Sequence, residues 1–147
     1  MPKALKTEYG ASFKVDFDKR YAIFTAVNKT FSHRAIEHMN ARGWNATIFS
    51  ERTGLSSRLY YYLQENEMYN PDFDSVLAVC VGLRLSERER TELFGLAGYS
   101  FSNSKRHFTI TYILNECNIK NIDDFNAAYM ALRIDGPNTK PPLKSFA

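Results

Sequence analysis

Four side chains near the middle of the chain offer polar groups to a partner: the hydroxyl of Ser57, the guanidinium of Arg58 and the phenols of Tyr61 and Tyr62. The apolar residues of the same stretch repeat at the spacing of one helix face, and they are Leu55, Leu59, Tyr60 and Leu63. A helix that buries this face turns the four polar side chains outward. Donors at a helix N-terminus can reach base edges and phosphates, and the helix dipole attracts anions. The pattern therefore predicts, over about residues 56–66, a helix suited to the groove of a nucleic acid.

Arg58, Tyr61 and Tyr62 each allow a second interpretation. An arginine can pair with O6 and N7 of guanine, the commonest base-specific contact, but Arg58 could also be solvated and paired with Glu51 or Glu65. Three consecutive tyrosines cannot all face inward on one helix. Tyr61 and Tyr62 could therefore contact DNA or form an apolar face that docks a protein.

Other residue types that could do chemistry are dispersed. The histidines are His33, His38 and His107, and the cysteines are Cys80 and Cys117. No two of the histidines have the i, i+4 spacing of a helical metal pair, and the cysteines have neither a CxxC partner nor a histidine at metal spacing. Asp123 and Asp124 stand at an expected helix start, where acids usually cap the helix. We therefore predict no catalytic residue, no metal and no cofactor, and the chain is not expected to be an enzyme.

Start and stop signals around the polar stretch predict the helices that position it. The text from 32 to 42 begins with Ser32, a capping residue type, and stops at Gly43. Asn45 caps a second helix to about residue 52, and Gly54 permits the tight turn before the third. A fourth helix is expected after the Asn-Pro-Asp text at 70–72, and a fifth from the Ser-Glu-Arg-Glu text at 86–89.

Residues 45–85 resemble the XRE family of lambda-repressor-like helix-turn-helix proteins. Seven constrained positions agree in register, and they are Ser50, Gly54, Leu55, Ser56, Tyr60, Leu63 and Pro71. The resemblance implies an all-α, lambda-repressor-like orthogonal helical bundle with additional N- and C-terminal helices. It also implies a sequence-specific, double-stranded DNA-binding regulator of transcription, with the helix at 56–66 in the major groove. The expected DNA contacts are Asn45, Thr47, Ser56, Ser57, Arg58, Tyr61 and Tyr62.

Segments on both sides extend this DNA-binding domain, which we place at residues 32–98. Residues 1–31 are a basic extension with a poorly ordered start; the text at 13–17 alternates as in a strand, but apolar residues at 21, 24, 27 and 31 step as in a helix, which we expect. Its cations Lys14, Lys19 and Arg20 could contact phosphates or be solvated. Residues 99–135 predict two further helices, which complete the core or form a two-fold interface. Residues 136–147 hold three prolines and a glycine, and predict a flexible tail.

Composition sets the remaining bounds. The chain has 147 residues, 44% of them hydrophobic, which is enough for a packed core. Its apolar runs fall well short of the roughly 18 residues that span a bilayer, so we expect a cytoplasmic protein with no membrane partner. The net charge is +3, but residues 33–70 carry four basic and four acidic groups and are neutral.

Two functions remain open from the sequence. Because lambda-like proteins usually bind paired half-sites, a DNA-binding regulator is expected to be a homodimer. The alternative is a protein-interaction module, such as an antitoxin or a partner-docking protein, that uses the tyrosine-rich helix; its partner is unknown. DNA affinity falls steeply with salt, whereas apolar docking does not.

Overall fold

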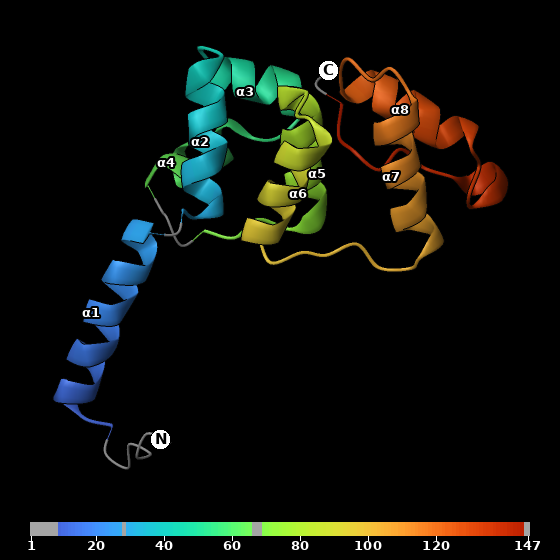
Figure 1. Cartoon of the computed structure of the whole chain (residues 1–147). Coiled ribbons are helices and arrows are strands. Elements are labelled where there is room, and N and C mark those ends of the chain that lie inside the picture. The colour runs from blue at the N-terminus through green and yellow to red at the C-terminus, as the bar shows by residue number, and fades with distance from the viewer. Residues whose placement is uncertain (1–8, 28, 66–68, 146–147) are drawn as a thin grey trace.

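Eight α-helices account for most of the computed structural model, which describes residues 9–27, 29–65 and 69–145. In chain order they are α1 (Ala11–Val27), α2 (Phe31–Ala41), α3 (Ala46–Thr53), α4 (Ser57–Glu65), α5 (Phe73–Leu83), α6 (Glu87–Leu96), α7 (Lys105–Glu116) and α8 (Ile122–Ala131), followed by a 3₁₀ turn, η1 (Gly136–Asn138). No strand occurs within the described ranges. The prediction of an all-α protein is confirmed (Figure 1).

Polar side chains fix where most of these helices begin. Six of them accept a hydrogen bond from a first-turn amide: Thr30, Asn45, Asp72, Ser86, Ser104 and Asn121. The text at 86–89 forms the expected reciprocal capping box, in which the Ser86 amide donates to Glu89 Oε1 (3.0 Å) and the Glu89 amide donates to Ser86 Oγ (3.3 Å). Such caps satisfy amides that have no partner inside the helix.

The predicted start of α2 at Ser32 is wrong. Thr30 is the cap, and its Oγ1 accepts a hydrogen bond from the His33 amide at 3.2 Å. Phe31 therefore opens this helix instead of ending the preceding one, and Phe31 and Ser32 are both buried. Burial of the Phe31 ring in the core accounts for the earlier start, because the first turn must then face inward.

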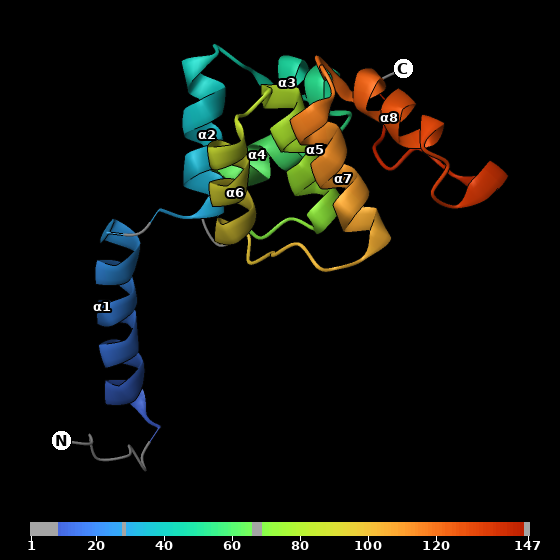
Figure 2. The same ribbon diagram turned by 45° about the vertical axis from the view of Figure 1, so that its right-hand side comes forward.

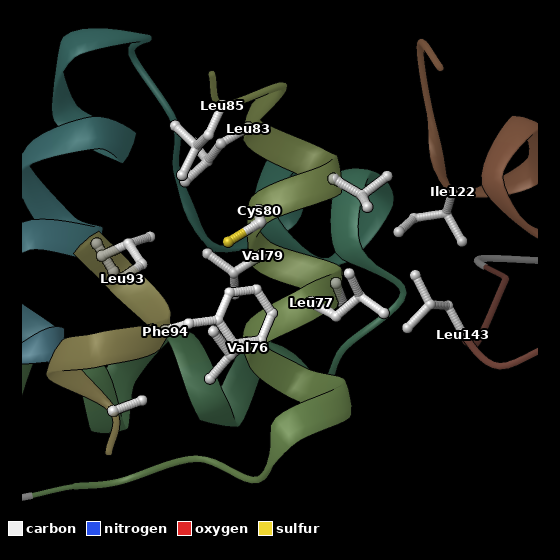
Figure 3. Close-up of a cluster of buried hydrophobic side chains, with 14 of the residues drawn as sticks. Val76, Leu77, Val79, Cys80, Leu83, Leu85, Leu93, Phe94, Ile122 and Leu143 are labelled. Carbon is white, nitrogen blue, oxygen red and sulfur yellow. The ribbon is translucent and has the colours of Figure 1, made fainter. Parts of the chain in front are cut away.

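Helix α5 lies at the centre of the packed body. Residues 76–83 are all buried, and α2, α3, α6 and α8 pack against this helix. Figure 3 shows Phe94 of α6 beside Val76 and Val79, whereas Leu77 lies on the side of Ile122 and Leu143. One helix therefore supports both the bundle of α2–α6 and the extension of α7 and α8.

The C-terminal segment folds back onto this body. Asn126 on α8 binds the backbone of Leu143 with both groups of its side-chain amide. Its Nδ2 donates to the Leu143 carbonyl (2.8 Å), and its Oδ1 accepts from the Leu143 amide (3.2 Å). Leu143 is buried, and the Ser145 hydroxyl donates to Asp123. We call residues 139–145 the C-terminal strap. The structure thus differs from the expected flexible tail: Pro137 lies in the 3₁₀ turn η1, and the extended segment after it is held because Asn126 binds the backbone of Leu143.

Helix α1 projects away from the other helices (Figures 1 and 2). It is helical from Ala11, so residues 13–17 are not a strand, and the helix begins earlier than the expected start after Asp18. Several of its large apolar side chains are exposed: Phe13, Val15, Phe17, Ile23 and Phe24. Most of the chain start that was expected to be poorly ordered lies outside the described residues.

Candidate nucleic-acid interface

A tight turn sets the angle between α3 and α4. Gly54 has a φ of 72°, in the left-handed region that favours glycine, and its amide donates to the Ser50 carbonyl at 2.9 Å. The buried Thr53 hydroxyl donates to the Phe49 carbonyl (2.6 Å) and accepts from the Leu55 amide (3.1 Å). These three hydrogen bonds are all local, because they join the turn to itself or to the last turn of α3.

The inner face of α4 packs on α2 and α3 as its pattern predicts. Tyr60 and Leu63 are buried, and Leu59 is half-buried. The Tyr60 ring lies 5.7 Å from that of Phe49, and its hydroxyl is 3.5 Å from the Trp44 carbonyl. This contact fixes which side of α4 faces solvent.

The outer face of α4 carries the four predicted contact residues, and Ser57, Arg58, Tyr61 and Tyr62 are all exposed. Tyr61 is 51% exposed and Tyr62 47%. Each ring contacts a second aromatic ring. Tyr61 contacts Tyr60 edge to face (5.5 Å between centroids), and Tyr62 stacks on Tyr69 (5.7 Å between centroids, 14° between planes). About half of the surface of each tyrosine therefore stays open to a partner.

Arg58 has an uncommitted guanidinium. Its backbone amide donates to Ser56 Oγ at 3.1 Å. Within the described part of the chain, neither Glu51 nor Glu65 forms an ion pair with it. The alternative in which Glu51 or Glu65 neutralises Arg58 is therefore not found among the described residues, and its five side-chain N–H donors are available to solvent or a partner.

The start of α3 lies in the same helix pair and carries two further predicted residues. Asn45 is exposed, but its Oδ1 accepts from the Ile48 amide at 2.9 Å, so its side-chain NH₂ is the group left to donate. Thr47 is exposed in the first turn. Ser56 is exposed too; its oxygen accepts from Arg58, and its hydroxyl hydrogen can still donate to a phosphate.

The backbone of Lys144, from the far end of the chain, lies next to the turn of this helix pair, and no local sequence pattern predicts this contact. A Cβ built on Gly54 would stand 1.9 Å from the Lys144 carbonyl, so the C-terminal strap touches the turn. Lys144 is exposed. Residues 33–70 are neutral, and the C-terminal strap brings the backbone of one exposed lysine to their turn.

The N-terminal cations named as candidate phosphate contacts are on α1, apart from α4. Lys14 Nζ pairs with Asp18 (2.6 Å), and Arg20 Nε pairs with Asp16 (3.2 Å), both at i, i+4 spacing. Lys19 is exposed. These pairs are solvent-exposed, so they hold the cations weakly.

The histidines lie in different environments and do not form a common site. His38 is buried, its Nδ1 lies 3.7 Å from Glu89, and its Nε2 has no hydrogen-bond partner within the described residues. Burial lowers the pKa of His38, and the positive charges of Arg34 and Arg42 act in the same direction. His107 stacks on Phe73 at 4.5 Å between centroids. Over the described ranges, no cluster of three or more His, Cys, Asp or Glu is placed to hold a metal.

Both cysteines are free thiols. Cys80 is buried in α5, and burial raises the pKa of its thiol to about 12. Cys117 is half-buried at the end of α7.

Comparisons with models of protein families, with curated proteins and with solved structures found no match to this chain. In the part of the chain that the structure describes, every helix is too short or too polar to cross a membrane.

Proposed function

We propose that this chain is a sequence-specific, double-stranded DNA-binding protein that regulates transcription and reads the major groove with α4. The observation that carries the proposal is the guanidinium of Arg58, which forms no ion pair with another described residue and is exposed in the first turn of a helix whose opposite face is buried in the core. Such a group matches the paired acceptors O6 and N7 of guanine. The role is one of binding and not of catalysis.

The helix order supports a lambda-repressor-like arrangement for α2–α6. Helix α4 packs on α2 and α3, α3 packs on α5, and α6 packs on α5 and α2. In helix-turn-helix proteins the second helix of the motif enters the groove and the first crosses the backbone. Applied to this chain, that geometry assigns α4 to the bases.

The expected contacts divide by chemistry. Arg58 and Tyr61 are the residues we assign to base edges. Asn45, Thr47, Ser56, Ser57 and Tyr62 are assigned to phosphates and sugars, which position the protein without specifying sequence. Two copies on adjacent half-sites complete the proposal, since readers of this kind usually bind as dimers.

Selection from a random pool of DNA duplexes at moderate salt tests this function. The wild-type chain should recover a motif, and Arg58→Ala should relax one position of it and weaken binding by about 1–3 kcal/mol. Arg88→Ala is the matched control, because Arg88 is an exposed arginine on α6, and this variant should recover the wild-type motif. Recovery of no motif by the wild-type chain would refute the proposal.

One observation favours a second function, the docking of a protein on α4. Tyr61 and Tyr62 expose phenol rings on a surface whose own segment is neutral. Salt separates the two functions: DNA binding should weaken steeply between 50 and 200 mM salt as counterions are released, whereas docking on aromatic rings should change little. Tyr61→Ala combined with Tyr62→Ala should weaken protein docking more than Arg58→Ala does.

A further inference from the structure

A pocket of about 420 Å³ lies between α6, α7 and the loop that joins them. Figure 2 shows these two helices beside α5 with the loop running below them. Arg90 and Asn115 bridge the helices at one place, where Arg90 Nη2 donates to Asn115 Oδ1 at 2.7 Å. The volume is within the range of small-molecule sites, which is about 300–1,000 Å³.

The walls of this pocket are mainly apolar. Four large side chains supply them: Phe94, Tyr99, Phe101 and Leu114. Phe94 is buried and holds Phe101 in edge-to-face contact at 4.9 Å between centroids, so this part of the wall is anchored to the core. A pocket of this kind favours a ligand with an apolar body.

Arg90 is the cation of the pocket. Its Nη1 donates to the Leu85 carbonyl at 2.9 Å, and with the bond to Asn115 this uses two of its five N–H donors. Within the described residues no carboxylate forms an ion pair with it. Arg90 is half-buried, whereas Glu87, the acid that also lines the pocket, is exposed at the start of α6. Glu87 attracts the Arg90 guanidinium, but because Glu87 is exposed, water weakens this attraction, and Arg90 is the more buried of the two charges that line the pocket.

We propose that this pocket binds a small organic acid, with its carboxylate on Arg90 and its aliphatic or aromatic body against Phe94, Phe101 and Leu114. A carboxylate complements a guanidinium whose donors are incompletely used and which is positioned by two hydrogen bonds. Binding here does not depend on whether the chain binds DNA, because Arg90 is on α6 and the proposed base contacts are on α4.

Titration of the ¹⁵N-labelled full chain with 3-phenylpropanoate, followed by NMR, tests the proposal. Saturable shifts are expected at the amides that line the pocket, such as Gly95, Phe101 and Leu114. The alcohol 3-phenylpropan-1-ol has the same apolar body without the charge, and it should bind at least tenfold more weakly. Equal affinity for the acid and the alcohol, shifts confined to other surfaces, or no saturable binding at millimolar concentration would each overturn the proposal.

Three variants distinguish binding of the ligand's carboxylate by Arg90 from binding of its apolar body by the pocket. Arg90→Gln should lower the affinity for the acid at least tenfold and leave the affinity for the alcohol unchanged, whereas Arg88→Gln on the same helix should alter neither. Gly95→Leu should abolish binding of both, because a Cβ on Gly95 meets nothing within 4 Å and the longer side chain fills the pocket without disturbing the helix. Unaltered acid binding by Arg90→Gln or by Gly95→Leu would contradict the assigned site.

Discussion

Helices α1 and α5 both carry many apolar side chains, but α5 buries most of them, whereas most of those described on α1 are exposed. Residues 76–83 of α5 are all buried, whereas Val15, Phe17 and Ile23 of α1 are mostly exposed. In α5, tertiary packing stabilises the helix. In α1 the described stabilising contacts are local: exposed i, i+4 ion pairs and ring contacts such as Phe17 with Tyr21. Apolar side chains therefore contribute differently to stability in the two helices, and the position of the helix in the fold decides how much.

The largest effect is expected from Leu77→Ala in the centre of α5. Leu77 is fully buried, and the variant loses both its transfer free energy and the contacts around the cavity that remains, which typically costs 2–5 kcal/mol. Ile23→Ala on α1 is the matched control and should change the free energy of unfolding by less than about 0.5 kcal/mol. Urea unfolding of both variants measures this difference. Similar losses would mean that α1 is also packed, for example on a second copy.

Gly54→Ala tests whether the C-terminal strap belongs to the packed body. A left-handed φ costs a non-glycine residue about 1–2 kcal/mol, and the added Cβ would collide with the Lys144 carbonyl. Gly43→Ala is the matched control, because Gly43 has a φ of 68° with nothing within 4 Å of the added Cβ. Gly54→Ala should therefore lower the midpoint of urea unfolding more than Gly43→Ala does.

Removal of residues 143–147 separates the two costs of Gly54→Ala, the strain of the left-handed φ and the collision with the Lys144 carbonyl. In this background the collision is absent, so the cost of Gly54→Ala should fall to that of Gly43→Ala. An unchanged cost would show that the strap does not press on the turn.

A smaller effect is expected from pH through His38. Burial lowers the pKa of His38 in the folded state, whereas in the unfolded chain the imidazole takes up a proton near pH 6.5. The contribution of His38 to stability is therefore fully present above pH 6.5 and declines as the pH falls from 6.5 toward the lowered pKa of the folded state. Glu89 and Glu92 oppose this effect, and Arg34 and Arg42 add to it.

Thermal unfolding of the wild type and of His38→Gln between pH 7.5 and 5 measures the contribution of His38. The variant should lose less stability on acidification than the wild type does. A variant that loses as much stability as the wild type would exclude His38 as the cause.

The smallest effect is expected from removal of residues 1–28. If α1 contributes only local contacts, the free energy of unfolding of the remaining chain should change by about 0.5 kcal/mol or less. Calorimetry at two protein concentrations makes the measurement. A large loss of stability, or a melting temperature that depends on concentration only when α1 is present, would assign α1 to an interface between copies.

Local patterns were sufficient to predict much of this molecule. Capping at Asn45 and Ser86, the turn at Gly54 and the burial of Tyr60 and Leu63 all depend on residues within a few positions of each other. The exposure of the candidate site residues follows from the same helical spacing.

Contacts between distant segments were not predictable in this way. Nothing near Gly54 in the sequence indicates that Lys144 lies against it, and nothing in a proline-rich tail indicates that Asn126 binds its backbone. The start of α2 was misplaced for a related reason, since burial of Phe31 is decided by the core and not by the capping preference of Ser32.

The placement of Cys80 makes the protein its own reporter of opening. A thiol with a pKa of about 12 inside α5 is protonated and shielded from alkylating reagents, so it reacts only during excursions that expose the centre of the fold. Cys117, half-buried at the end of α7, requires a smaller excursion. In one sample, the alkylation rate of Cys80 therefore measures opening of the centre of the fold, and that of Cys117 measures a more local opening, with no engineered label.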